Sequence, residues 1–357
     1  MTLSPARTLR TRLRGWLSLR RLTSVYLIAL LVLLPSLEWF AEHVLALGIL
    51  LFAPPQFFSA PAFALGFVAL ARKRWQILAV NAACAAIVLI VFMGLRFHFS
   101  RKSPQATFSV ITHNIGQGNR SAFVDSFPGE DPDAVLLQDV TNANRRERDY
   151  MRRYPEYHNR GLGQFMLLTP HKIESVSLVR EALWRGQAVA ARFVINLSGS
   201  PVAIYCVHMP TPRDSLSGAI SPRVLLEMLG VRDASTGRFA SYREWIDARV
   251  TLARQLAAVF DKEELPFVVG GDFNTPDHGV IYRLMAQRLS DAHVVAGHGW
   301  GFTFPGGKDS RLSALLGHWL RLDYLFAGRG WQPTDCRVAD DDTSQHRAVL
   351  ARFAPLP

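Results

Sequence analysis

The chain has 357 residues, of which 49% are hydrophobic, and its formal net charge is +11. The charge is unevenly spread, because residues 1–103 hold 12 Lys and Arg against 2 Asp and Glu, whereas residues 104–357 hold 28 against 27. Because residues 104–357 are nearly neutral, they do not form a domain that its overall charge would draw to nucleic acid. The basic surplus in residues 1–103 lies beside apolar segments, which is typical of a membrane protein.

Three apolar stretches precede residue 100, over residues 23–39, 43–71 and 75–95. About 20 apolar residues cross the hydrocarbon of a bilayer, so the sequence predicts about three transmembrane helices within residues 23–95. Pro54, Pro55 and Pro61 interrupt the middle stretch. A re-entrant hairpin there would reverse the side of the membrane on which the following residues lie.

The basic residues predict an orientation. Residues 1–22 are rich in arginine, and Arg72, Lys73 and Arg74 follow the second stretch. Both segments are expected to be cytoplasmic, because short cytoplasmic loops carry an excess of Lys and Arg. With three spans, the rest of the chain lies on the extracytoplasmic side of the cell (inner) membrane. Residues 96–106 would form a linker of at most ~40 Å that keeps residues 107–357 close to the bilayer.

From residue 107 onward, short runs of β-branched and aromatic residues alternate with turns and a few helices. Helices are predicted at residues 241–260 and 278–287, and residues 211–238 have the composition of a long irregular insertion. The predicted strands cover residues 107–115, 134–138, 164–168, 188–196, 202–208, 267–270, 322–326 and 348–353.

Polar residues stand at the ends of several predicted strands. They are Asn114, Asp139, His208, Asp272 with Asn274, Asp323, and Gln345 with His346. Each one alone is also what a turn, a helix cap or an ordinary histidine would supply. Since the ends of adjacent strands converge on one rim of a sheet, the whole set predicts a single site. Gly270 and Gly271 are expected to let the backbone turn sharply before Asp272.

The order of these residues resembles the endonuclease/exonuclease/phosphatase (DNase I-like) superfamily. The most specific match is Gly-Asp-Phe-Asn at residues 271–274, supported by Asn114, Leu-Leu-Gln-Asp at 136–139, Val-His at 207–208, Arg-Leu-Asp-Tyr at 321–324 and Ser-Gln-His at 344–346. The resemblance spans residues 107–353 and implies a four-layer α/β sandwich of two packed β-sheets flanked by helices. The preceding apolar segments are similar to those of membrane-anchored, extracytoplasmic members, including the type associated with glycopeptide resistance.

The resemblance implies a metal-dependent hydrolase of phosphoric esters. Asn114 and Asp139 would hold Mg²⁺ or Mn²⁺, with Gln345 as a weak further ligand. The family usually has Glu at the position of Asp139 and Asp at that of Gln345. Aspartate at position 139 is a shorter metal ligand than glutamate, and the uncharged amide of Gln345 is a weaker ligand than aspartate. Thr303 and Phe304 would form a loop over the site that selects the substrate.

The remaining residues have expected roles in catalysis. Asp272 would take a proton from the attacking water, which Asn274 would help to position. His208 and His346 would donate hydrogen bonds to the phosphate oxygens. Asp323 would bind the other ring nitrogen of His346 and fix its tautomer.

Three functions follow from the sequence. The first is a phosphoesterase that acts at the lipid bilayer on a phosphate or pyrophosphate ester, with a lipid-linked ester within its reach. The second is an extracytoplasmic nuclease, for which nucleic acid would be the partner; five arginines at residues 145, 146, 148, 152 and 153 form a local basic cluster. The third is a catalytically degenerate binding domain, which the departures at Asp139 and Gln345 leave open.

Overall fold

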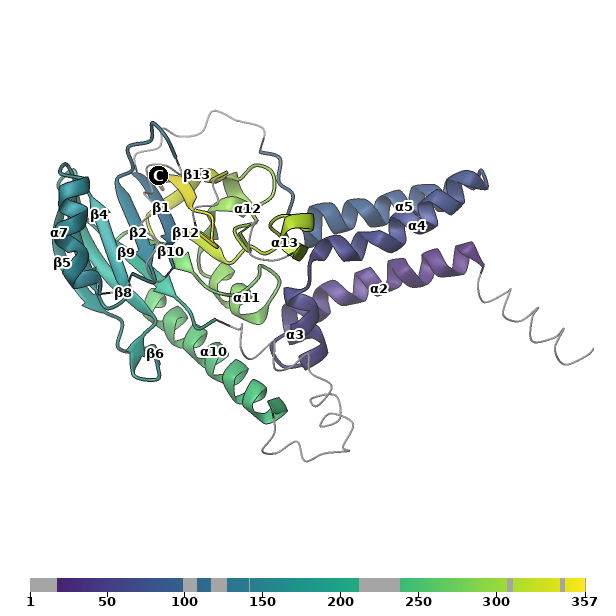
Figure 1. Cartoon of the computed structure of the whole chain (residues 1–357), viewed down its shortest axis with the longest axis horizontal. Helices are drawn as coiled ribbons and strands as arrows, with labels where there is room; N and C mark the ends of the chain where they lie inside the picture. Colours follow the sequence, from purple (N-terminus) through teal and green to yellow (C-terminus); the bar gives the residue numbers. More distant parts are fainter. Residues whose placement is uncertain are drawn as a thin grey trace, which may run out of the picture.

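The structure, a computed structural model, describes residues 18–98, 108–116, 127–140, 142–211, 238–306, 311–340 and 344–356. Most of the predicted segment 1–22, the predicted linker from residue 99 onward and the interior of the predicted insertion at 211–238 lie outside these residues. The described residues form a group of N-terminal helices followed by a β-rich domain (Figure 1).

The N-terminal helices correspond to the three predicted spans. They are α2 (Leu19–Phe40), α3 (Leu45–Phe52), the 3₁₀ turn η1 (Pro55–Ser59), α4 (Ala60–Ala71), α5 (Trp75–Ile87) and the π-helical turn η2 (Val88–Phe92). Two continuous helices, Leu19–Phe40 and Trp75–Phe92, are long and apolar enough to cross a membrane. The predicted middle span is instead a pair of helices bent by 98°. The bend falls at Pro54 and Pro55, where a proline restricts the preceding residue and cannot continue the helical hydrogen bonds.

Helices α2, α4 and α5 run beside one another away from the β-rich domain, and α3 lies close to that domain (Figure 1). The start of α2 and the turn between α4 and α5 are at the far end (Figure 1). Asn81 of α5 donates a 2.9 Å hydrogen bond to the hydroxyl of Thr23 in α2. Large apolar side chains such as Val25 and Phe67 are exposed, which agrees with the composition expected of membrane-crossing helices.

The β-rich domain contains two six-stranded mixed sheets. The first has the order β13 (Trp331–Val338), β14 (Val349–Pro355), β1 (Phe108–Asn114), β2 (Ala134–Gln138), β4 (Phe165–Thr169) and β3 (His158–Leu162). The second has the order β11 (Ser290–Asp291), β12 (Asp323–Ala327), β10 (Phe267–Asp272), β9 (Ser200–His208), β8 (Ala190–Leu197) and β5 (Lys172–Leu178). A small hairpin of β6 (Leu183–Trp184) and β7 (Gln187–Ala188) leads into β8.

Helices cover the outer faces of both sheets. They are α7 (Ala143–Arg153) on the first sheet and α10 (Arg238–Asp261) and α11 (Val280–Ala286) on the second. The short α12 (Ala292–Ala296) packs beside β12 and β13, and α13 (Arg311–Leu316) precedes β12 in the chain. The two sheets share one apolar core, in which Val110 of β1 and Ile204 of β9 are buried. A second core joins the outer face of the second sheet to α10 and α11, and a third joins the first sheet to α7. The predicted four-layer α/β sandwich is thereby confirmed.

The strands that carry alternating apolar residues lie where the sequence places them, with ends shifted by a few residues. Among the strands that the sequence analysis does not predict, β3, β5, β11 and β13 lie at sheet edges, while β6 and β7 form the small hairpin. The side chains of β5 are mostly exposed or half-exposed. The predicted helix 241–260 is α10, and the predicted helix 278–287 is the shorter α11.

Candidate active site

The register of the strands explains why distant polar residues meet. In the second sheet, Asp272 at the end of β10 pairs with His208 of the parallel strand β9 and with Asp323 of the antiparallel strand β12. In the first sheet, Asn114 at the end of β1 pairs with Gln138, the residue before Asp139. The ends of β1, β2, β9 and β10 therefore supply the polar residues of one rim, as the sequence analysis expects.

Asp272 is the centre of this group. Its side chain is fully buried. Its Oδ2 accepts hydrogen bonds from the side-chain amides of Asn114 at 2.8 Å and of Asn274 at 3.0 Å. Its Oδ1 accepts one from the backbone N–H of Asn274 at 2.8 Å. Two amides and one peptide group thus fix the orientation of the carboxylate.

Two imidazole rings approach the same carboxylate oxygen. Nε2 of His208 lies 3.8 Å from Asp272 Oδ2, and Nε2 of His346 lies 3.7 Å from it. The opposite nitrogen of each ring has its own acceptor: Gln164 Oε1 at 2.6 Å from His208 Nδ1, and Asp323 Oδ2 at 2.8 Å from His346 Nδ1. Because each Nδ1 faces an oxygen acceptor, Nδ1 carries a hydrogen in both rings and Nε2 is presented to the site.

The environment of Asp272 changes its acidity. Burial, to which the negative charge of Asp323 adds, raises the pKa of Asp272 above its ordinary value. The neighbouring His346 and His208 and the hydrogen bond from Asn114 act in the opposite direction. A carboxylate with a raised pKa is a better proton acceptor than an ordinary aspartate.

The predicted substrate-loop residues lie behind the histidine. Thr303 is fully buried, and its hydroxyl accepts hydrogen bonds from the backbone N–H groups of Leu322 at 3.1 Å and Asp323 at 3.2 Å. The ring of Phe304 lies 4.9 Å from that of His346, measured between centroids. In the structure Thr303 therefore supports the start of β12, and Phe304 contacts His346.

The site opens into a cleft of about 910 Å³. The other predicted site residues that line this cleft with Asp272 are Asn114, Asp139, His208, Asn274, Gln345 and His346. Asp139 follows β2 with φ = 58°, a backbone conformation that non-glycine residues seldom adopt and that is found preferentially at functional sites.

The donor atoms of this region suit a hard divalent cation. Mg²⁺ and Mn²⁺ prefer oxygen ligands, and Asn114, Asp139 and Gln345 offer an amide, a carboxylate and a second amide at the cleft. Ligand atoms of Asp272, Asp323 and His346 also lie within 4.8 Å of one another. Oδ1 of Asp323 is buried without a hydrogen-bond partner, which leaves a free carboxylate oxygen. The residues present therefore fit the expected metal.

The glycines before Asp272 have a different role from the expected sharp turn, since both lie within β10. A Cβ on Gly271, whose φ is 149°, would lie 1.9 Å from the carbonyl oxygen of Val207. A Cβ on Gly270 would lie 2.7 Å from Leu325 Cδ2 and 2.8 Å from Leu136 Cδ1. These glycines allow β10 to approach its neighbours closely, and so they bring Asp272 next to His208.

Two supporting residues are missing from the sequence analysis. Gln164, which accepts from His208, directly precedes β4. Arg249 of α10 is buried and donates to the backbone carbonyls of Phe273 at 3.2 Å and Asn274 at 2.7 Å. The sequence gives no sign of the contacts of Arg249, because arginines are common in amphipathic helices. The position of Gln164 next to an apolar strand is a weak sequence signal.

Comparison with known proteins agrees with this geometry. The family model described as Endonuclease/Exonuclease/phosphatase family matches residues 111–346, which include every predicted catalytic and metal-binding residue. No curated protein matches the sequence significantly.

Solved structures with a similar fold include a functionally unknown conserved protein from Enterococcus faecalis V583 (15% identity, TM-score 0.49, 70% of this chain and 100% of that one). Another is a mannosyl-6-phosphatase from Bacteroides thetaiotaomicron VPI-5482 (14% identity, TM-score 0.47, 69% and 99%). A third is a humanized TDP2 from D. rerio (13% identity, TM-score 0.46, 69% and 98%).

The family match covers more than half of the chain and includes the rim where Asp272, the two histidines and the two asparagines meet. This chain belongs to the endonuclease/exonuclease/phosphatase family.

Proposed function

We propose that the protein is a membrane-anchored phosphoesterase that requires Mg²⁺ or Mn²⁺. The family to which it belongs consists of hydrolases that act on phosphoesters. The observation that carries the proposal is the buried Asp272 carboxylate, held by Asn114 and Asn274 and approached by the Nε2 atoms of His208 and His346 at the cleft. A proton acceptor flanked by donors is what in-line attack of water on phosphorus requires.

In this mechanism Asp272 accepts a proton from water, whose oxygen forms a bond to phosphorus as the bond to the leaving oxygen breaks. Asn274 orients Asp272 and the water. His208 and His346, protonated on both ring nitrogens, would donate from Nε2 to the non-bridging oxygens, where negative charge is held in the transition state. Asp323 and Gln164 keep these rings in the required orientation.

Asn114 and Asp139 would hold the metal ion, with Gln345 as a weaker ligand. When bound, the ion would neutralise the negative charge on the phosphate oxygens and on the leaving oxygen. Aspartate at position 139 is one methylene shorter than the usual glutamate, and the amide of Gln345 carries no charge. We expect both differences to weaken metal binding compared with a site that has two carboxylates there.

The arrangement of the helices supports anchoring in the cell (inner) membrane with the catalytic domain on the extracytoplasmic side. The start of α2, with Arg20 and Arg21, and the turn at residues 72–74 lie at the same end, away from the β-rich domain (Figure 1). If this basic end is cytoplasmic, α2, η1 with α4 (Pro55–Ala71) and α5 with η2 (Trp75–Phe92) make three crossings and the catalytic domain is outside. The α3 segment stays on the catalytic side, so the bend at the prolines does not change the parity.

A lipid-linked ester fits the contacts between the two parts. The sequence of α3, Leu-Ala-Leu-Gly-Ile-Leu-Leu-Phe, has only apolar side chains. Leu45 of α3 packs in one cluster with Tyr242 and Trp245 of α10, and Trp184 packs against it. Trp184 and Trp245 also line the cleft. These apolar contacts connect α3 to residues that line the cleft, and so the cleft lies within reach of an ester whose lipid chain remains in the bilayer.

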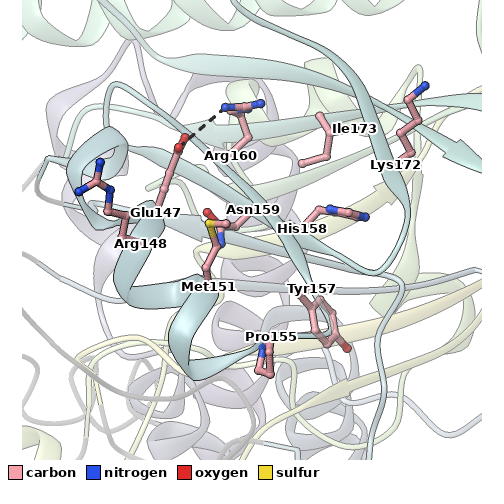
Figure 2. A pocket seen from close by; sticks show the side chains of 10 residues that line it. All are labelled: Glu147, Arg148, Met151, Pro155, Tyr157, His158, Asn159, Arg160, Lys172 and Ile173. Carbon is pink, nitrogen blue, oxygen red and sulfur yellow. Dashed lines mark ion pairs between the residues drawn. The ribbon is translucent and has the colours of Figure 1, made fainter.

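The alternative, an extracytoplasmic nuclease, has one observation in its favour. A groove of about 1020 Å³ beside α7, β3 and β5 is lined by Arg148, Arg160 and Lys172 (Figure 2), and Glu147 lies 3.8 Å from Arg160. However, this groove shares no lining residue with the catalytic cleft. It also lies at the end of the molecule opposite α2, α4 and α5 (Figure 1). We therefore favour the lipid-phosphate substrate over nucleic acid.

The test is phosphate release from a polyprenyl diphosphate by the full-length protein in detergent, with Mg²⁺ or Mn²⁺, beside Asp272→Asn and a plasmid-cleavage assay. Metal-dependent release that is absent in the variant supports the proposal. Plasmid nicking without phosphate release would support the nuclease. Absence of both activities in the folded protein would support the third function, a catalytically degenerate binding domain.

A further inference from the structure

The hairpin of β6 and β7 has an unusual turn. Trp184 pairs with Gln187 across the hairpin, and the two residues between them, Arg185 and Gly186, have φ of 50° and 81°. Positive φ at both central positions is the type I′ turn, in which Asn-Gly is strongly preferred. An arginine at the first central position is unfavourable for the backbone, and such residues are found preferentially at functional sites.

The base of this hairpin is fixed to a catalytic strand. The backbone N–H of His208 donates to the carbonyl of Val189 at 2.8 Å, and the N–H of Val189 donates to the carbonyl of Ala182 at 3.1 Å. On the other side, Trp184 packs against the cluster that contains Tyr242 and Trp245. The position of the turn relative to His208 is therefore set by hydrogen bonds and by packing. In Figure 1 the hairpin projects beyond the end of β8, beside α10.

The charge of the cleft makes Arg185 distinctive. Among the described residues that line the cleft, Arg185 is the only lysine or arginine. Its side chain is exposed, and the guanidinium carbon lies 5.4 Å from the centre of the Trp184 ring. A cation over an aromatic face is held in place without losing its hydrogen-bond donors. No carboxylate of the described part of the chain pairs with it, and its exposed side chain can offer these donors to a ligand.

We propose that Arg185 is an anion-binding subsite for a second phosphate group of the substrate, next to the phosphate that is hydrolysed. The inference rests on the proposed phosphoesterase function and adds a substrate preference to it. A planar guanidinium can bind a phosphate through two parallel hydrogen bonds. With a diphosphate ester, water attacks the terminal phosphorus and the bond from that phosphorus to the bridging oxygen breaks. The products are inorganic phosphate and the monophosphate ester, and Arg185 holds the phosphate group that remains on the alcohol.

Gln187 and Trp184 complete the subsite on the hairpin. Both line the cleft with Arg185. Gln187 contributes amide donors next to the guanidinium, while Trp184 limits its movement. On the catalytic rim the side-chain amides of Asn114 and Asn274 already donate to Asp272. The two histidines are the donors that remain for one phosphate, so a second phosphate needs the additional donors that the hairpin presents.

The experiment compares farnesyl diphosphate with farnesyl monophosphate, which differ only in the second phosphate, using the full-length protein in detergent. The variant is Arg185→Asn, because Asn-Gly suits the type I′ turn and removes the charge without disturbing the backbone. The matched control is Arg329→Asn, an exposed arginine in the turn after β12, at the end of that strand away from Asp323.

We expect Arg185→Asn to lower the ratio of kcat/KM for the diphosphate to that for the monophosphate by about 10- to 100-fold. The thermal midpoint should stay the same or rise, and Arg329→Asn should leave the ratio unchanged. An unchanged ratio in Arg185→Asn, with both esters still hydrolysed, would overturn the subsite and leave the proposed function intact. Failure of the wild-type protein to hydrolyse either ester would overturn both.

Discussion

The carboxylate of Glu42, which follows α2, accepts a 2.8 Å hydrogen bond from the backbone N–H of Val280 in α11 of the β-rich domain. It also accepts one from Ile281 at 3.1 Å, and it is buried. A Cβ added at Gly279 would lie 2.4 Å from its Oε1. The end of α2 is therefore docked closely against α11, the helix that follows the Asp272–Asn274 turn.

This contact extends to the catalytic residues through Arg249. Burial lowers the pKa of Arg249 to about 10, and the negative charges of Glu42 and Asp272 act against that change. Arg249 donates to the carbonyls of Phe273 and Asn274. The charge of Glu42 thus helps to keep the buried arginine charged beneath the turn that carries Asp272.

Glu42→Gln should destabilise the catalytic domain by about 1–3 kcal/mol, because a neutral amide offers one acceptor oxygen to two N–H donors and removes the charge near Arg249. The measurement is the thermal midpoint of the full-length protein in detergent, followed by tryptophan fluorescence. Glu38→Gln is the control, since no hydrogen bond joins Glu38 to the described part of the catalytic domain. Equal midpoints for the two variants would contradict a structural role of Glu42.

Asp272→Asn should lower kcat by about 10²- to 10⁴-fold, because the amide cannot accept a proton from water. The isosteric side chain should preserve the fold, which circular dichroism checks. The control is Asp261→Asn, an exposed residue of α10 whose carboxylate contacts Arg288. Near wild-type turnover by Asp272→Asn would mean that another group is the base.

Removal of divalent cations by a chelator should abolish activity, and Mg²⁺ or Mn²⁺ should restore it. Asp139→Asn should raise the cation concentration for half-maximal activity by about 10-fold or more, because an amide replaces the only predicted carboxylate ligand. Asp139→Glu restores the residue that the family usually has, and we expect it to bind the cation at least as well as wild type. Asp131→Asn, at an exposed position, controls for the loss of charge. An unshifted Mg²⁺ titration in Asp139→Asn would place the cation instead at Asp272, Asp323 and His346.

The proposed topology predicts different reactivities of two engineered cysteines in intact cells. Lys73→Cys, in the turn between α4 and α5, should be protected from a membrane-impermeant maleimide. Asp261→Cys, at the end of α10, should react. The native cysteines are buried and give a low background. The reverse labelling pattern would place the catalytic domain in the cytoplasm.

Much of this architecture can be predicted from the sequence because the interior strands are apolar and end in polar residues. β10 and β9 are such strands, and their pairing alone brings Asp272 to His208. Edge strands are different. β5 pairs on one side only and is mostly exposed, so its sequence has no need of apolar alternation. β13 contains Pro333 and a bulge between Pro333 and Asp335, which hide its strand character.

The support of the site is harder to predict, because it depends on contacts between residues far apart in the chain. Arg249 is one polar residue of an otherwise ordinary helix until α10 is placed beneath the Asp272–Asn274 turn. Arg185 has no significance in the sequence until β8 and β9 bring its hairpin beside His208. In the sequence, Glu42 is a charged residue between two apolar stretches. Its hydrogen bond with the backbone N–H of Val280 becomes evident only in the fold.

A last prediction concerns acid stability and the buried Glu263. Burial would raise the pKa of Glu263, but hydrogen bonds from Arg192, Tyr205 and the backbone of Leu265 outweigh it and lower the pKa from 4.5 to about 2. A lowered pKa in the folded state means that the stabilisation is present above about pH 4.5 and is lost as the pH falls towards 2.

The wild-type protein should therefore lose on the order of 3 kcal/mol from this group over that interval. Glu263→Gln should be less stable at neutral pH, and its unfolding free energy should depend less on pH below 4.5. Urea unfolding in detergent at pH 7, 5 and 3 measures this, with Glu264→Gln, the exposed neighbour, as the control. If Glu263→Gln and the wild-type protein lost the same free energy between pH 5 and pH 3, the Arg192–Glu263 pair would not be a source of acid sensitivity.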